Sequence, residues 1–235
     1  MTMADELKAL LGSRGADIIG FADLREIAPE IRGGLPFGLS IAVALNPQII
    51  SEIQEGPTKQ YYAEYERANQ LLDLLGHLAV RFLEERGQRA RWFAATAAGI
   101  DAKTLSTLLP HKTVATRAGL GWIGKCALLV TWTFGSAVRI TSVLTDANLP
   151  TGDMIDMSQC GSCHACVDVC PGQAPSGKEW QVNLHRDAFF DPFACRKAAR
   201  KLAMSKIGIR DDICGMCIAV CPWTQNYIKN YLLSI

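Results

Sequence analysis

The sequence predicts a mixed α/β (α+β) domain followed by a small cysteine-rich domain. Residues 1–152 contain a single cysteine, Cys126, and alternate between helix-like and strand-like segments, a mixture typical of layered α/β and α+β domains. Residues 153–235 contain the other eight of the nine cysteines, in two punctuated runs. With 235 residues, of which 49% are hydrophobic, the chain is long enough for one sizeable core and a smaller second domain.

The expected elements of the first domain follow from hydrophobic periodicity. Residues 59–87 carry apolar side chains at three- and four-residue spacing, which predicts a long helix ending at Gly87. Residues 1–15 predict an amphipathic helix, and residues 148–153 a connector to the second domain. Strands are predicted, from β-branched residues followed by turn formers, at 16–21, 39–45, 91–96, 127–131 and 137–144.

Composition excludes several classes of protein. The formal net charge of +1 provides no basic field for nucleic acid or an anionic membrane. No apolar run reaches the length of a membrane span, and the first residues do not form a secretory leader. We therefore expect a cytoplasmic protein that does not associate with membranes.

The cysteine spacing of the second domain predicts two [4Fe–4S] clusters. The first run, Cys160-x2-Cys163-x2-Cys166-x3-Cys170-Pro, is the pattern of bacterial ferredoxins, in which the fourth cysteine ligates the other cluster. The first cluster would therefore be held by Cys160, Cys163, Cys166 and Cys221. The second would be held by Cys170, Cys195, Cys214 and Cys217, with Cys195 in place of the usual first cysteine of the second run.

Other uses of the cysteines fit the spacing less well. Zinc prefers paired Cys-x2-Cys knuckles and does not need three cysteines at three-residue intervals before Cys-Pro. A disulfide framework is disfavoured by the lopsided cysteine usage. The ninth cysteine, Cys126, lies in an apolar stretch and is interpreted as a buried small hydrophobe.

The segment Gly119-Leu-Gly121-Trp122-Ile-Gly124-Lys125 matches G-x-G-x-x-G literally. A dinucleotide fingerprint needs a strand before it and a helix after it. Here residues 111–118 favour helix and the residues that follow favour strand, so the context is inverted. Two interpretations stay open: a loop whose backbone approaches a flat or bulky cofactor, and a tight turn without a ligand.

Together these features resemble the epoxyqueuosine reductase family, relatives of corrinoid-dependent reductive dehalogenases. The resemblance is carried by residues 15–22, 117–125 and 141–150 and by both cysteine runs down to Trp223, and it spans most of the chain. It implies a nitroreductase-like domain at 1–152 that holds base-off cobalamin, followed by a double-[4Fe–4S] ferredoxin-like domain at 153–235. It also implies that Gly119, Gly121, Trp122, Gly124 and Lys125 lie near the corrinoid.

The chain departs from the family pattern in two respects. Family members that reduce the tRNA base have further helical repeats after the ferredoxin domain, whereas this sequence ends at Ile235. We therefore expect a short form that does not act on tRNA. The acid regarded as the family's proton donor is absent or displaced to Asp101, which is interpreted as a helix N-cap, so no proton donor is assigned.

One basic segment stands out in the second domain: Arg196, Lys197, Arg200, Lys201, Lys206 and Arg210. Helical spacing would place several of them on one face. The simpler interpretation is a solvated face that also offsets the negative charge of clusters and thiolates. The functional alternative is docking of an acidic electron donor.

The sequence supports three functional hypotheses. The first is a cobalamin-dependent reductase with two cubane clusters, served by a low-potential donor such as ferredoxin or flavodoxin and acting on a small molecule or on the corrinoid itself. The second keeps the nitroreductase-like domain but fills it with FMN. The third is a ferredoxin-type electron carrier without catalysis of its own.

Overall fold

The computed structural model describes residues 1–96 and 100–233, and the chain divides into two compact units. The first unit comprises residues 1–44, 67–121 and 139–155, and the second comprises residues 45–66, 122–138 and 156–235. Residues 45–66 and 122–138, which lie within the predicted 1–152 domain, thus pack with the cysteine runs. One contact shows why: the amide of Ser136 donates to Oγ1 of Thr224 at 3.1 Å.

The first unit is built on a four-stranded sheet in the order β1-β2-β6-β3. Its strands are β1 (Ile18–Asp23), β2 (Phe37–Ala44), β3 (Ala90–Phe93) and β6 (Val138–Thr145). β1 and β2 are antiparallel with Ile18 opposite Ala42, and β3 and β6 are antiparallel with Ala90 opposite Thr145. Each of these strands was predicted, and together with the helices they confirm the mixed α+β class.

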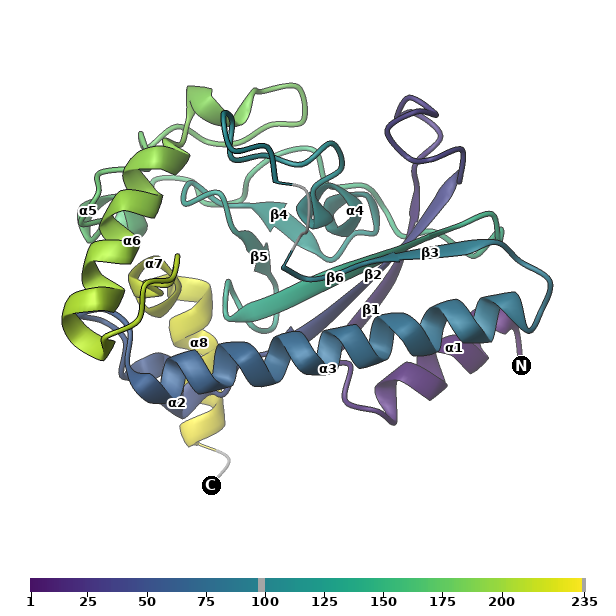
Figure 1. The fold of residues 1–235 in the computed structure, drawn as a ribbon, viewed down its shortest axis with the longest axis horizontal. Coiled ribbons are helices and arrows are strands. Elements are labelled where there is room, and N and C mark those ends of the chain that lie inside the picture. Colours follow the sequence, from purple (N-terminus) through teal and green to yellow (C-terminus); the bar gives the residue numbers. More distant parts are fainter. Residues whose placement is uncertain (97–99, 234–235) are drawn as a thin grey trace. The chain divides into compact units, whose positions relative to one another are not determined.

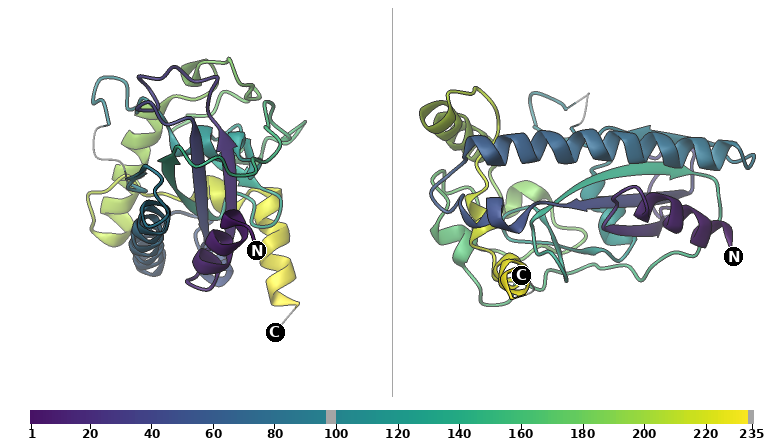
Figure 2. Two further views of the ribbon diagram at one scale, coloured as in Figure 1. Left: turned by 90° about the vertical axis from the view of Figure 1, so that its right-hand side faces the viewer. Right: turned by 90° about the horizontal axis from the view of Figure 1, so that it is seen from below.

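Helices cover both faces of this sheet (Figures 1 and 2). α1 (Met3–Gly12) and residues 67–84 of α3 (Lys59–Glu84) lie on one side, and α4 (His111–Arg117) packs against β1 and β2 on the other. Glycine permits the close approach of α4, because a Cβ at Gly38 would lie 2.8 Å from Cγ1 of Val114. The helices predicted at 1–15 and 59–87 and the helical character of 111–118 are confirmed.

α3 meets β3 at a second glycine. A Cβ built at Gly76 would lie 2.1 Å from Cδ1 of Trp92, so the indole ring occupies the space that a side chain would need. The Trp92 indole N–H donates to Oγ1 of Thr141 at 3.1 Å, and its ring lies 4.3 Å from the His77 ring. The half-buried Trp92 ring thus links α3 to β3 and β6.

The second unit contains a two-stranded sheet and several short helices. The strands are β4 (Gly121–Ile123) and β5 (Leu129–Thr131). The helices are α2 (Pro47–Ser51), the first turns of α3, α5 (Ala165–Asp168), a 3-10 turn at Arg186–Ala188, α6 (Pro192–Ile207), α7 (Met216–Ala219) and α8 (Pro222–Leu232). The cysteines lie on or beside these helices: Cys166 within α5, Cys195 within α6, Cys217 within α7 and Cys221 at the N-cap of α8.

The interpretation of Asp101 as a helix N-cap is wrong. Asp101 forms an isolated bridge with Ser106, and its carboxylate accepts the backbone N–H of Lys103 at 2.7 Å, so it stabilises a turn. Residues 97–99, just before it in the stretch searched for a proton donor, lie outside the described residues. Across 1–96 and 100–233, no helix combines the length and hydropathy that crossing a membrane requires.

Candidate functional site

The first cysteine run encloses a cavity of about 200 Å³ within the second unit. Six thiol groups line it, together with Gly124, Lys125 and Trp223: those of Cys126, Cys160, Cys163, Cys166, Cys217 and Cys221. All four cysteines expected to hold the first cluster are thus brought together around one space. A Cβ at Gly124 would lie 2.9 Å from Cγ2 of Val130 and 3.6 Å from Sγ of Cys160, so only glycine leaves this wall of the cavity clear.

Lys125 anchors the loop that carries the first two cysteines. Its side chain is only 3% exposed, and Nζ donates to the carbonyl oxygens of Gly161 at 2.7 Å and Cys163 at 2.9 Å. The buried ammonium thereby satisfies two carbonyl groups of the loop and places a positive charge beside the thiols. Such a charge favours thiolate over thiol, which is the form that binds iron.

Backbone amides at the start of α8 point toward Cys221. Burial raises the pKa of the Cys221 thiol, and the neighbouring N–H groups of Thr224 and Trp223 act against that shift. Cys221 is the N-cap residue of α8. The N–H groups in the first turn of a helix have no intrahelical partner and carry partial positive charge. The site therefore supplies donors to the last thiolate of the run.

Cys126 lies among these thiols. It is buried, as the sequence predicted, but its thiol interacts with those of Cys166 and Cys217. The interaction with Cys126, together with burial, raises the pKa of the Cys166 thiol. The sequence did not predict this placement, because Cys126 lies 34 residues before Cys160. The one hint in the sequence is that Cys126 directly follows Lys125, whose side chain binds the cysteine loop.

A second group of thiols contains Cys170, Cys195 and Cys214. Burial raises the pKa of Cys195 to about 11, and the neighbouring groups of Cys170 and Cys214 add to the shift. Burial also raises the pKa of Cys214, with a further contribution from Cys170. Three of the four expected ligands of the second cluster are therefore close together, whereas Cys217 faces the first cavity. None of the nine cysteines forms a disulfide, and any thiol proton on the eight expected ligands would be displaced when iron binds.

Three tryptophans pack beside the first cavity. The ring of Trp122 lies 4.7 Å from that of Trp132 and 5.2 Å from that of Trp223, and Trp132 and Trp223 are 5.4 Å apart. Trp122 is completely buried, Trp223 lines the cavity and Trp132 is 52% exposed. The trio thus leads from the wall of the thiol cavity to the surface of the second unit.

The glycine-rich segment has no dinucleotide-binding context, as predicted, because it follows α4 and runs into β4. Gly119 has φ +73°, and a Cβ there would lie 2.7 Å from the carbonyl oxygen of Asp153. Gly121 begins β4, Trp122 joins the aromatic trio, and Gly124 and Lys125 line the thiol cavity. Packing and the cysteine loop thus account for most of the residues expected near a corrinoid.

Residues 159–224 match the family model of the 4Fe-4S double cluster binding domain. The epoxyqueuosine reductase of Synechococcus sp. (strain RCC307) is 30% identical over an alignment of 236 positions, which covers 94% of this chain and 65% of that protein. The chain thus spans slightly less than two thirds of this relative's length. The sequence match covers both units.

Solved structures show the same fold. A reductive dehalogenase whose structure is described as suggesting a mechanism for B12-dependent dehalogenation superposes with a TM-score of 0.73 at 18% identity, over 99% of this chain and 34% of that chain. An epoxyqueuosine reductase bound to a tRNA-Tyr stem loop gives a TM-score of 0.63 at 22% identity, over 96% and 66%. Taken with the sequence match and the double-cluster domain, these findings make the chain similar in sequence to epoxyqueuosine reductases and similar in fold to both epoxyqueuosine reductases and reductive dehalogenases.

Proposed function

We propose that this protein is an iron–sulfur oxidoreductase that passes low-potential electrons through two [4Fe–4S] clusters to a base-off corrinoid. The observation that carries the proposal is the thiol-lined cavity whose cysteine loop is anchored by the buried Lys125. The match to a double-cluster domain and the kinship with epoxyqueuosine reductases support the same chemistry. The nitroreductase-like character of the first domain is part of the proposal.

The residues of the second unit suit the clusters. We assign Cys160, Cys163, Cys166 and Cys221 to the first cluster and Cys170, Cys195, Cys214 and Cys217 to the second. Bound clusters supply reversible one-electron transfer, at potentials set by charge, hydrogen bonds to sulfur and solvent exposure. In this chain Lys125 contributes charge, the N–H groups of Trp223 and Thr224 lie beside Cys221, and the expected ligand cysteines are half-buried.

Cobalamin is the proposed electron acceptor because a structural neighbour is described as B12-dependent and the family resemblance implies the same group. A bound corrinoid supplies a low-valent cobalt centre, which needs a low-potential donor. Among the residues expected near it, Trp122 and Lys125 are committed to the aromatic trio and the cysteine loop. We therefore assign this group no contact residue, and the role of Gly119–Lys125 beside it stays a prediction.

Anaerobic purification followed by spectroscopy tests the proposal. We expect about eight iron atoms per chain and the broad visible absorption of cubane clusters. Added cob(II)alamin should show the spectral change of losing its lower axial base, and its dissociation constant should be measurable by that change. Iron near half this value would contradict the two-cluster assignment, and an unchanged cobalamin spectrum would contradict the corrinoid assignment.

The same preparation distinguishes the alternatives. Copurifying FMN would favour the flavin reductase, and the absence of both cofactors from a protein with intact clusters would favour the electron carrier. Activity on tRNA is a separate question, since one relative of known structure was solved with a tRNA stem loop. Our expectation that tRNA is not the substrate stays a prediction, tested by incubating the reduced protein with epoxyqueuosine-modified stem loop.

A further inference from the structure

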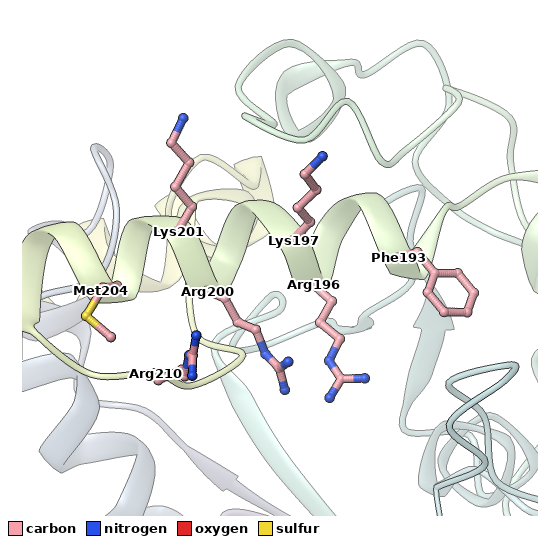
Figure 3. A pocket seen from close by; sticks show the side chains of 7 residues that line it. All are labelled: Phe193, Arg196, Lys197, Arg200, Lys201, Met204 and Arg210. Atoms are coloured by element: carbon pink, nitrogen blue, oxygen red, sulfur yellow. The ribbon is translucent and has the colours of Figure 1, made fainter.

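A basic groove of about 660 Å³ runs along α6 in the second unit. Figure 3 shows that side chains from successive turns of the helix border it, with Arg210 contributed by the segment that follows. Its lining consists of Phe193, Arg196, Lys197, Arg200, Lys201, Met204 and Arg210. Residues 191–212 hold six lysines and arginines and three aspartates, a net +3 in a chain whose total is +1. The positive charge of this protein is therefore concentrated here.

The arginines and lysines of the groove are held differently. Asp212 pairs with Arg196 at 3.1 Å and forms a second, shorter ion pair with Arg200, so one carboxylate positions two guanidinium groups. The structure records no ion pair for Lys197 or Lys201 with any residue in 1–96 or 100–233, and both are exposed. In Figure 3 these two lysines extend away from the side occupied by Arg196 and Arg200. Their charges are thus available to a partner.

Two apolar side chains lie at the ends of the groove. Phe193 and Met204 are each 49% exposed, although both are large and hydrophobic. Arginine, methionine and aromatic residues are enriched in protein–protein interfaces, where apolar contacts supplement charge pairs. Phosphate backbones are bound mainly through charge and donors, without a need for such apolar ends. The combination favours a protein partner over a nucleic acid.

The groove adjoins the second thiol group. Cys195 belongs to α6 and directly precedes Arg196, and its thiol interacts with those of Cys170 and Cys214. A partner seated on α6 would therefore lie against the helix that supplies one of these thiols. Electron transfer between proteins requires such proximity of the two redox groups, and charge complementarity accelerates the encounter.

We infer that the α6 groove is the docking surface for an acidic, low-potential electron-donor protein of the ferredoxin or flavodoxin class. The inference rests on the proposed function, because it requires a cluster at the second thiol group. In each encounter the reduced donor loses one electron and the second cluster gains it, so no bond forms or breaks. The lysines steer the acidic surface, and Phe193 and Met204 contact its apolar part.

Charge variants of the two lysines test the inference. The pair Lys197→Gln and Lys201→Gln should weaken binding of an oxidised, fluorescently labelled plant-type [2Fe–2S] ferredoxin roughly tenfold at low ionic strength. Replacing both with glutamate should weaken it further, and salt should weaken the wild type most of all. The matched control is Lys103→Gln with Lys229→Gln, which removes the same charge from two exposed sites on other elements.

A kinetic measurement separates docking from cluster damage. Stopped-flow reduction of the holoprotein by photoreduced ferredoxin should slow in the α6 variants, while reduction by a small deazaflavin radical stays at the wild-type rate. Equal losses in the control pair, or binding that does not depend on salt, would overturn the inference. So would variants that keep ferredoxin binding but lose binding of total tRNA, which would mark a nucleic-acid surface.

Failure of the proposed function would look different. Missing iron or an unchanged cobalamin spectrum contradicts the cofactor assignments, whereas ferredoxin binding is measured with the oxidised donor and without cobalamin. In one outcome the protein binds cobalamin and holds both clusters, but its affinity for ferredoxin does not change when Lys197 and Lys201 are replaced. That outcome would leave the proposed function intact and would contradict the docking surface.

Discussion

The side-chain ammonium of Lys125 lies 2.7 Å from the carbonyl oxygen of Gly161 and donates a hydrogen bond to it. A second hydrogen bond, to the carbonyl of Cys163, spans the same loop. A charge buried without a carboxylate is costly unless other groups compensate it. The two carbonyl dipoles provide part of that compensation, and ligating thiolates would add to it, so Lys125 connects the glycine-rich segment to the cysteine run.

Replacing Lys125 with methionine should therefore affect the first cluster. The change leaves two carbonyl groups without their donor, at a cost of about 1–3 kcal/mol each, and removes a positive charge from beside the thiolates. We expect lower iron occupancy, faster loss of the cluster in air and a more negative midpoint potential in an EPR-monitored redox titration. Lys178→Met, an exposed lysine after the same run, is the control; an unaltered potential in Lys125→Met would contradict the assigned role.

The ligand assignment predicts that Cys195→Ala and Cys217→Ala remove the same cluster. Cys195 lies with Cys170 and Cys214, whereas Cys217 lines the first cavity. Comparing the two variants therefore tests whether Cys217 is a ligand of the second cluster. Iron analysis and EPR of the reduced protein should show one remaining cluster with the same spectrum in both variants. Different residual spectra would instead place Cys217 in the first cluster.

Cys126→Ala should retain both clusters. Eight cysteines satisfy two cubanes, so the proposed assignment leaves Cys126 as the surplus thiol even though its thiol interacts with those of Cys166 and Cys217. We expect wild-type iron content with a shifted midpoint potential, because a neighbour of the ligating sulfurs is lost. Cys160→Ala is the comparison and should lose the first cluster. Loss of about half the iron in Cys126→Ala would show that Cys126 is a ligand.

Gly76→Ala should destabilise the first unit. Alanine within a helix normally stabilises it by about 1 kcal/mol relative to glycine. At position 76 the new Cβ would overlap the Trp92 indole, so the sign should reverse to a loss of about 1–3 kcal/mol. Gly12→Ala at the end of α1, where nothing lies within 4 Å of the added Cβ, is the control and should not destabilise. Thermal denaturation of both variants measures the difference.

His111 should make stability depend on pH. Its Nε2 lies 2.9 Å from the Ala94 carbonyl and its Nδ1 lies 3.0 Å from Oγ of Ser142, an arrangement that suits a neutral ring donating from Nε2. Burial lowers the pKa of His111 below its usual 6.5. The unfolded chain thus binds a proton more readily, so the stabilisation is present above pH 6.5 and declines as the pH falls toward the folded-state pKa.

NMR titration of the His111 ring should show that lowered pKa directly. His111→Gln, which cannot titrate, should flatten this part of the stability profile between pH 6.5 and the folded-state value. His185, which is exposed, is the control position. A His111 pKa at or above 6.5 would contradict the neutral, buried arrangement.

Much of the local structure was predictable because it depends on neighbours in the chain. Apolar spacing predicted α3, β-branched runs predicted β1 and β2, and helical spacing placed the basic residues of α6 together. Asp101 was misread because an aspartate that caps a turn and one that caps a helix have the same local sequence.

By itself the sequence predicted the iron–sulfur chemistry of this protein, because cluster ligation depends on cysteine number and spacing, and both are properties of the chain. It also determined the mixed fold class and the inverted context of the glycine motif. Only the tertiary structure decided which residues surround the thiols. Lys125 and Cys126 lie more than thirty residues before the first cysteine run, and they reach it because 122–138 packs with 156–235 in one unit. Contacts over such separations leave no periodic trace in the sequence, and packing alone establishes them.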